Sequence, residues 1–595
     1  MREEQSNENG AATGRTGNFN CTETTEPSWK QAFAPQADGI AKQVMATQCN
    51  KYDTVYNMRM KMQFSFFGLA TLMYAGFYAI CMHKNDAGIA FCFFIAATVV
   101  YFFESMKRLE LKIKKGTFFY LVAMELLSVS TFCTDDSRII LLNKTGIFLL
   151  TISLLLRQFY DTAGWGLGKY LVSIVYTIFG SMEELDQPFY DGAAALRNGN
   201  KEKKLLWNVF LGVVLAVPLL AVVIGLLSSA DIFFARLTNL MVEDMDTSGG
   251  FWLIVRVLLM FFGTYILFAF LCRQRIKKKV QEHRTGEPVT AITVAGLLTA
   301  VYLLFSGIQI FGLFLGKLQL PQEYTYSAYA REGFFQLLAV GILNLVLVLV
   351  FLNYTRESKA LKGVLVVMSA CTYIMIASST MRILMYIDAY KLTFSRIMVL
   401  WTLALLAVLF AGVMIRIFRK EFRLFRYSVV AVTVLYLGLS FAHPDYLIAN
   451  VNVEREKVDY GLLSSLSADA APALVPYFRN EADKTDLYVE DCEQRYIFRM
   501  QRLKERLDIR TFNISRYLAG QVCDAYAQEA PEDGMETAAA ETILETTVET
   551  ASETTVETVS ETALVEKTTQ GEQRKGRSYS QNEQVVLGSF LPAGE

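Results

Sequence analysis

Long apolar runs follow one another along most of this chain, and they restrict its fold more than any other feature. A helix needs about 20 apolar residues to cross the roughly 30 Å hydrocarbon core of a membrane. About eleven runs reach or approach that length, and we expect spanning helices at 64–82, 87–103, 117–132, 139–156, 205–229, 251–272, 290–315, 334–352, 363–380, 397–415 and 427–442. Hydrophobic residues make up 53% of the sequence and charged residues 19%. The chain is therefore predicted to be all-α, a polytopic transmembrane helix bundle with polar ends.

The connections between these runs alternate in charge. After every even-numbered run the connection is rich in Lys and Arg, as at 107–115 and 416–426, whereas the connections after odd-numbered runs are less basic or acidic. Short cytoplasmic loops carry an excess of Lys and Arg, and one missed or spurious helix would break the alternation from that point onward. We therefore expect a cytoplasmic N-terminus, an extracytoplasmic C-terminus and a location in the cytoplasmic (plasma) membrane.

One apolar segment does not fit the count of spans. The stretch KYLVSIVYTIFG (169–180) is apolar but too short to span comfortably. If it did span, the basic connections after it would face outward. We therefore predict an interfacial or re-entrant helix on the cytoplasmic side.

The polar parts of the chain flank the bundle, which occupies 63–442. Residues 1–62 form a polar cytoplasmic segment, and residues 529–595 form a Thr/Glu-rich tail; we expect the first to be largely disordered and the second disordered. Residues 443–528 are expected to form an extracytoplasmic helical domain. One apolar stripe along a helix supports this expectation: Val489, Cys492, Tyr496, Met500, Leu503 and Leu507.

Three stretches are distinctive when they occur together and in this order. They are YSAYAREGFFQLLAV (326–340), SSTMRILMYIDAYKLTFSRIMVLW (378–401), and residues 443–474 with their Pro-Asp, NVNVER and LSADAAPAL elements. With them the chain resembles a bacterial membrane family known only as a domain of unknown function, numbers 4153 and 4173 of that series, over roughly residues 64–525. The resemblance implies a polytopic protein of a bacterial cytoplasmic membrane and carries over no activity. Lys391 stands where such families tend to have glycine, so a tight backbone turn is less expected there.

Four polar side chains lie within the predicted spans: Glu125, Arg256, Gln309 and Asn344. A carboxylate at the depth of Glu125 is costly unless it is paired, protonated or facing water. Arg256 can instead extend its side chain outward from its span, while Gln309 and Asn344 are typical of interhelical hydrogen bonds. If Glu125, Arg256 and Asn344 lined one polar path, the protein would be a carrier.

Charged residues also gather at the predicted external surface: Arg331, Glu332, Arg382, Asp388 and Arg396. With neighbouring tyrosines such as Tyr386 and Tyr390 they could form a cleft for an anionic headgroup or a sugar. An aromatic belt at the membrane surface explains the tyrosines equally well.

Cysteines and histidines do not indicate a metal site. The nine cysteines have no paired C-x-x-C spacing, and His83, His283 and His443 are far apart. An extracytoplasmic compartment permits a disulfide, and Cys492 and Cys523 are its candidates. Cys492 also fits the apolar stripe as a small hydrophobe.

Signatures of soluble enzymes are missing from the sequence. It has no G-x-x-x-x-G-K-[ST] phosphate loop, no H-E-x-x-H and no G-x-S-x-G. We predict no catalytic residue, no cofactor and no nucleic acid partner. Membrane lipids are the expected partners, together with an envelope or protein partner for the C-terminal domain.

Three functions stay open at this point. The protein is a carrier of a small or anionic solute, an envelope sensor or scaffold that acts through its external C-terminal domain, or an enzyme that transfers a lipid-linked group with an external carboxylate as base. No inverted repeat is evident, which weakens the carrier. The residues alone predict an integral membrane protein of the bacterial cell envelope with no assignable activity.

Overall fold

The structure is all-α in the part of the chain that it describes. This computed structural model describes residues 54–162, 165–197, 219–220, 223–234, 236, 250–274, 276, 286–311, 326–419, 421–454, 458–480 and 487–529. The chain forms two units, Met1–Cys523 and Asp524–Glu595, and only residues 524–529 of the second are described. Every side-chain and backbone contact described below lies within the first unit.

Nine helices within the described ranges are long and apolar enough to cross a membrane. They are α4 (Phe64–Cys81), α5 (Ala90–Arg108), α7 (Ser137–Phe159), α12 (Gly250–Cys272), α14 (Pro288–Gln309), α15 (Tyr326–Tyr354), α16 (Lys359–Tyr390), α17 (Phe394–Phe418) and α18 (Leu424–Phe441). A shorter apolar helix, α6 (Thr117–Cys133), fills the place of the third predicted span. The predicted span at 205–229 lies largely outside the described residues. This set of helices is compatible with a multi-pass membrane protein.

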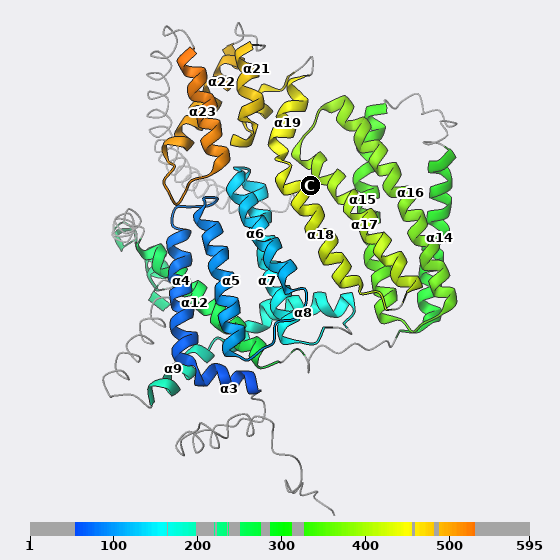
Figure 1. Cartoon of the computed structure of the whole chain (residues 1–595). Coiled ribbons are helices and arrows are strands. Elements are labelled where there is room, and N and C mark those ends of the chain that lie inside the picture. Colours follow the sequence, from blue (N-terminus) through cyan, green and yellow to red (C-terminus); the bar gives the residue numbers. More distant parts are fainter. Residues whose placement is uncertain are drawn as a thin grey trace, which may run out of the picture. The chain divides into compact units, whose positions relative to one another are not determined.

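The helices pack around two apolar cores. The first core gathers buried side chains mainly from α4, α5, α6, α7 and α12, and the second gathers them from α14 to α17. Helix α18 lies between the two groups, because it contacts α6 on one side and α17 on the other. Figure 1 shows this arrangement, with α4 to α7 and α12 on one side of α18 and α14 to α17 on the other.

Loop contacts define two ends of the bundle. At the Thr134 end, where α4, α6, α16 and α18 finish, Asn513 Nδ2 donates to Thr134 O over 2.9 Å and Arg510 Nη1 donates to Ile80 O over 2.9 Å. At the opposite, Lys114 end, Lys114 Nζ donates to the carbonyls of Arg157 and Tyr160, both over 2.7 Å. The described connections rich in Lys and Arg, at 107–115, 356–362 and 416–426, follow helices that finish at the Lys114 end.

Short helices pack at the Lys114 end. Helix α8 (Leu167–Gly180) contains the short apolar segment that the sequence predicts to be interfacial. It contacts α7, α12 and α18. Helices α3 (Val55–Met62), η1 (Ser181–Glu184) and α9 (Gln187–Arg197) lie against α12. Arg273 donates to Glu184 and to Gln187, and Tyr265 Oη donates to Asp191 over 2.9 Å. A buried polar cluster therefore fixes these helices to the end of α12.

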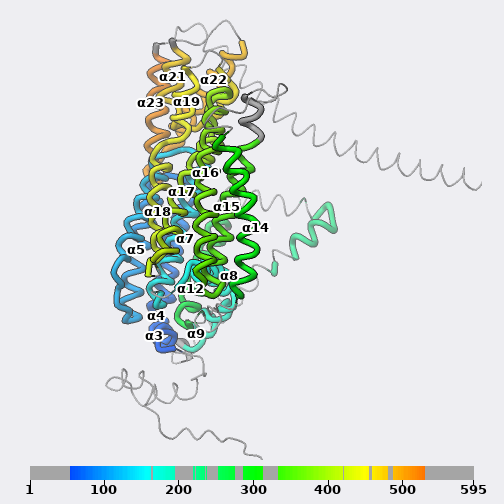
Figure 2. The backbone as a smooth tube through the Cα atoms, turned by 90° about the vertical axis from the view of Figure 1, so that its right-hand side faces the viewer, coloured from blue at the N-terminus to red at the C-terminus, as the bar shows by residue number. Residues whose placement is uncertain are grey.

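The C-terminal helices begin directly after α18: α19 (Pro444–Val453), α20 (Tyr460–Ser464), η3 (Ala468–Ala470), α21 (Ala471–Asn480), α22 (Leu487–Glu505) and α23 (Ile514–Glu529). The predicted apolar stripe is present on α22, where Val489, Cys492, Tyr496 and Met500 are buried. Asp459 caps α20 by accepting from Leu462 N over 3.0 Å. Figure 2 shows α19, α21 and α22 beyond the end of α16 to α18.

Candidate functional site

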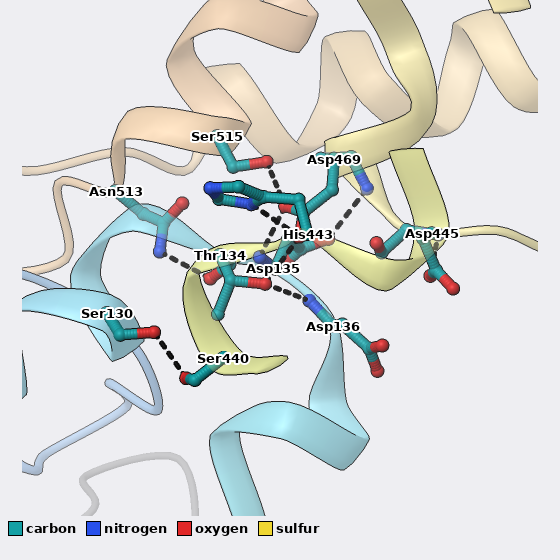
Figure 3. Close-up of polar contacts among 12 residues, drawn as sticks. Ser130, Thr134, Asp135, Asp136, Ser440, His443, Asp445, Asp469, Asn513 and Ser515 are labelled. Atoms are coloured by element: carbon teal, nitrogen blue, oxygen red, sulfur yellow. Dashed lines mark hydrogen bonds and ion pairs between the residues drawn. The ribbon is translucent and has the colours of Figure 1, made fainter. Parts of the chain in front are cut away.

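The carboxylate of Asp469 is the centre of a polar cluster at the Thr134 end. Its Oδ2 accepts from Thr134 Oγ1 over 2.5 Å, and its Oδ1 accepts from Asp135 N over 2.9 Å and from Ser515 Oγ. His443 Nδ1 lies 3.2 Å from Oδ2. Figure 3 shows the side chains of Thr134, His443 and Ser515 directed at this one carboxylate. Four separate segments of the chain therefore meet at Asp469, whose side chain is fully buried.

A second layer of charges surrounds this carboxylate. Arg138 makes a bidentate contact with Asp136, at 2.8 and 3.0 Å, and its Nη2 also lies 2.5 Å from Asp445 Oδ1. Arg516 Nε donates to Asp135 Oδ1 over 2.5 Å. Buried carboxylates are costly unless they are paired and hydrogen-bonded, and Asp136 and Asp445, which are both buried, meet both conditions. We call Thr134, Asp135, Asp136, Arg138, His443, Asp445, Asp469, Asn513, Ser515 and Arg516 the junction.

Local sequence explains why these residues are available. Helix α6 ends before Thr134, and Asp136 caps α7 by accepting from Arg138 N over 2.9 Å, a role that short polar side chains fill readily. His443 has the left-handed backbone angle φ = +48° at the start of α19. The carboxylate of Asp445, in the first turn of α19, accepts from Ser467 N over 2.9 Å and from Arg138.

The linker between α22 and α23 completes the junction by docking on the α4–α5 loop. Ile89 N donates to Phe512 O over 2.9 Å, and Asn513 Nδ2 donates to Ala87 O over 3.0 Å. Gly88 permits this approach, because a Cβ there would lie 2.4 Å from Arg510 O. The C-terminal helices are thus joined to the first apolar core by backbone as well as side-chain contacts.

Electrostatics favours the charged forms of the central pair. The hydrogen bond to Asp469 raises the pKa of His443 above its usual range, although partial burial opposes this shift. Burial would raise the pKa of Asp469, but the bonds from His443, Ser515, Thr134 and the Asp135 amide outweigh it, so the pKa is lowered. The pair is therefore favoured as an imidazolium beside a carboxylate.

The same geometry limits what chemistry the junction can perform. A nucleophilic hydroxyl would need to bond the second ring nitrogen of His443, on the side away from Asp469. The two hydroxyls at this carboxylate, on Thr134 and Ser515, both donate to Asp469 itself. The arrangement is that of a titratable contact between segments and not of an activated nucleophile.

The structure brings two of the predicted residues together. Gln309 Oε1 accepts from Arg382 Nη2 over 3.3 Å and from Ser378 Oγ over 2.7 Å, which joins α14 to α16. Both Gln309 and Arg382 are buried. Arg382 had been assigned to the external surface, whereas α16 continues as one helix through residue 390 and buries this guanidinium between helices.

The other intramembrane candidates contact separate partners. Asn344 Nδ2 donates to Thr372 Oγ1 over 3.0 Å, between α15 and α16. Glu125 accepts from Ser128 Oγ within α6, over 3.2 Å, and Arg256 Nη1 donates to Met82 O over 2.8 Å. Within the part of the chain that the structure describes, Glu125, Arg256 and Asn344 share no hydrogen-bond partner.

The remaining surface candidates fall at the α16–α17 turn or outside the described side chains. Arg396 Nη1 donates to Tyr390 O over 2.6 Å and lies over the Tyr386 ring, 4.4 Å from its centroid. Asp388 is exposed. The backbone of Arg331 and Glu332 belongs to α15, but their side chains are not among those described.

Lys391 adopts the conformation for which glycine is the usual residue. Its φ is +73° and its ψ is 172°, so the tight turn that the sequence disfavoured is present between α16 and α17. Asn452 holds the next residue, because its Oδ1 accepts from Leu392 N over 3.0 Å and its Nδ2 donates to Leu392 O over 2.9 Å.

Cys492 and Cys523, the candidates for a disulfide, are both buried, on α22 and α23. Their pairing stays a prediction. The junction itself was not among the predicted sites. Its signal was the density of short polar residues in TDDSR, in the Pro-Asp element and in LSADAAPAL, which alone does not say that these segments meet.

Comparison with known proteins places most of the bundle and part of the junction in one family. A family model described as "Domain of unknown function (DUF4153)" matches residues 121–477. No curated protein and no solved structure matches the chain.

Proposed function

The chain belongs to the DUF4153 family, a family whose function is not defined, and from this premise we propose that it is a sensor or scaffold of the bacterial envelope that acts through residues 443–528. It is a multi-pass membrane protein whose C-terminal helices receive an external signal or partner. The bundle then transmits that state to the basic connections at its other end.

The observation that supports this proposal is the convergence of three other segments of the chain on the buried carboxylate of Asp469. The donors come from the α6–α7 corner, the start of α19 and the start of α23, so a change in the C-terminal helices reaches α6 and α7 directly. A hydrogen-bonded network of this kind has few intermediate arrangements, because each unpaired buried group is costly. It therefore suits a two-state contact between an external segment and the bundle.

We place the Thr134 end outside the cytoplasm. The basic connections at the Lys114 end support this orientation, since short cytoplasmic loops are enriched in Lys and Arg. The test is labelling of Ser465→Cys, an exposed position after α20, with a membrane-impermeant maleimide in a cysteine-free background. Labelling of intact cells supports the orientation, and labelling only after the cells are opened contradicts it.

The function is tested by photocrosslinking in intact cells. A crosslinker at Arg495 or Arg502, both exposed on α22, is expected to capture an envelope component or protein. A crosslinker at Leu297, exposed on α14 within the bundle, is the control for contacts with lipid alone. If the α22 positions capture only what Leu297 captures, the sensor or scaffold is wrong.

A second candidate function, an anion carrier, rests on one observation. Arg382 is a buried cation within α16 and bonds Gln309 across to α14, and buried ionisable groups in membrane helices often mark ion pathways. Uptake of anions into proteoliposomes, lost in Arg382→Gln and kept in Arg256→Gln, would favour the carrier. Equal anion leak in proteoliposomes of the unmodified protein and of both variants would exclude the carrier.

A further inference from the structure

A basic pocket lies at the Lys114 end, away from the junction. Its volume is about 140 Å³, several times the roughly 30 Å³ share of one water molecule in the liquid. The α5–α6 loop contributes Lys114, the end of α7 contributes Arg157, and the start of α18 contributes Arg423 and Arg426. Four cations from three segments of the chain therefore line one small space.

Two of the guanidinium groups converge above a glycine. Gly116 has φ = +90°, and a Cβ built on it would lie 2.9 Å from Arg157 Nη2 and 3.0 Å from Arg426 Nη2. Like charges held this close repel one another, and a bound anion would offset that repulsion. Arg157 Nε is also buried with no hydrogen-bond partner among the described residues.

The charge of the pocket is only partly balanced. Asp161 is the one carboxylate that lines it, against the four cations. Neither Arg423 nor Arg426 has an ion-pair partner within the described ranges, and both residues are exposed. An anion can therefore reach the pocket from solvent or from the membrane surface.

One wall of the pocket is aromatic. Tyr170 stacks on Phe425 with ring centroids 3.4 Å apart, and Trp165 lies against Tyr170 at 5.3 Å. Trp and Tyr are typical of the level of lipid headgroups, where one side of the ring is apolar and the other is hydrated. The wall gives the apolar part of an anionic ligand a surface to contact.

We propose that this pocket binds a phosphate group, supplied either by an anionic phospholipid headgroup or by a soluble phosphate compound. Arginine guanidinium groups match the oxygens of phosphate in a bidentate way. Basic pockets between membrane helices bind anionic headgroups by this chemistry. The site goes beyond the proposed function, since it does not involve residues 443–528.

Binding is measured on the full chain, purified in neutral detergent. The sequence has five tryptophans, and replacing Trp29, Trp207, Trp252 and Trp401 with Phe leaves Trp165 as the reporter. Inorganic phosphate is expected to change Trp165 emission with saturation. In parallel, native mass spectrometry of protein from nanodiscs of phosphatidylcholine, with and without phosphatidylglycerol, reports retained lipid.

The two probes distinguish the sources. Retention of phosphatidylglycerol that competes with phosphate assigns a lipid headgroup, and phosphate binding without such retention assigns a soluble compound. The double variant Arg423→Gln with Arg426→Gln is expected to weaken binding about tenfold or more. Lys112→Gln with Lys359→Gln removes the same charge from exposed residues outside the pocket lining and is expected to leave binding nearly unchanged.

The proposal is overturned if neither probe binds, or if the control pair weakens binding as much as the pocket pair. Thermal unfolding of each variant shows whether it is folded. If the double variant does not fold, Arg157→Lys is tested in its place. This substitution keeps the positive charge but removes the planar guanidinium group that binds phosphate in a bidentate way, and phosphate binding is expected to fall about tenfold. Unchanged binding in a folded Arg157→Lys protein would then contradict the proposal.

Discussion

Asn452 and Leu392 are paired as if they were neighbours in a β-ladder, with the side-chain amide of Asn452 donating to Leu392 O and accepting from Leu392 N. Asn452 is 1% exposed, so water does not readily replace either bond. Asn452→Leu would leave a donor and an acceptor without partners at the α16–α17 turn. We expect a loss of about 2–4 kcal/mol of stability, measured by thermal unfolding in detergent. Unchanged unfolding would show that this pair does not hold the turn.

Lys391 occupies a strained backbone conformation, and glycine should relieve it. At φ = +73° and ψ = 172° a side chain costs on the order of 1–3 kcal/mol, of which the entropy of glycine in the unfolded chain offsets part. We expect Lys391→Gly to stabilise the protein by about 1 kcal/mol. Thr393→Gly, at the ordinary φ of −138°, is the control and should destabilise it. A gain in both variants would point to charge or side-chain effects instead of strain.

Gly88 is required by a close backbone approach. A Cβ would lie 2.4 Å from Arg510 O and 2.6 Å from Thr511 Cα, and backbone atoms on both sides cannot rotate away. We expect Gly88→Ala to cost about 1–3 kcal/mol and to loosen the α22–α23 linker from the α4–α5 loop. Gly76→Ala is the matched control, because nothing lies within 4 Å of a Cβ there. Ile89 N donates to Phe512 O and Ala90 N donates to Arg510 O, so faster hydrogen exchange at these two amides in the first variant alone is the expected result.

The stability of the junction should depend on pH through His443. Because Asp469 raises the histidine pKa, the stabilisation is complete below the unfolded pKa of about 6.5 and is lost as pH rises through the folded value. The lowered pKa of Asp469 keeps its own contribution intact until strongly acidic pH. Protease resistance of residues 506–516 is therefore expected to fall on moving from mildly acidic to alkaline pH.

The control for this pH dependence is His443→Gln. The other charged groups at the junction are Asp135 and Asp136 from the α6–α7 corner, Arg138 from α7, Asp445 from α19 and Arg516 from α23. They are present in both proteins, so the difference between the two pH profiles reports the histidine. Parallel profiles would show that the imidazole does not contribute.

The spanning helices were predictable because the membrane imposes a local requirement. Each span must be apolar over its own length, whatever its neighbours are. The ends were less predictable: hydropathy placed a span at 363–380, whereas α16 runs from Lys359 to Tyr390 and includes Arg382 and Asp388, which were expected at the external surface. Apolar composition reports contact with hydrocarbon, and a helix can continue beyond it.

The junction could not be predicted, because it depends on distant pairs. Thr134 and Asp469 are separated by 335 positions, and Asn513 and Ala87 by 426. Short polar residues such as these occur in any external loop, so composition does not distinguish a solvated aspartate from the buried Asp469. The resemblance of residues 443–474 to a family motif was the strongest signal, but it gave no partner for any side chain.

The docking of the α22–α23 linker on the α4–α5 loop has a consequence for biosynthesis. The carbonyls of Ile80 and Ala87 emerge from the ribosome more than 400 residues before Arg510 and Asn513, their donors. Contacts of such long sequence separation form late, after the chain segments between them have been synthesised. The contacts of the α4–α5 hairpin therefore stay incomplete until the last helices have been synthesised. Truncation shortly before residue 510 would leave most of the polypeptide, with its first loop still open to quality-control proteases.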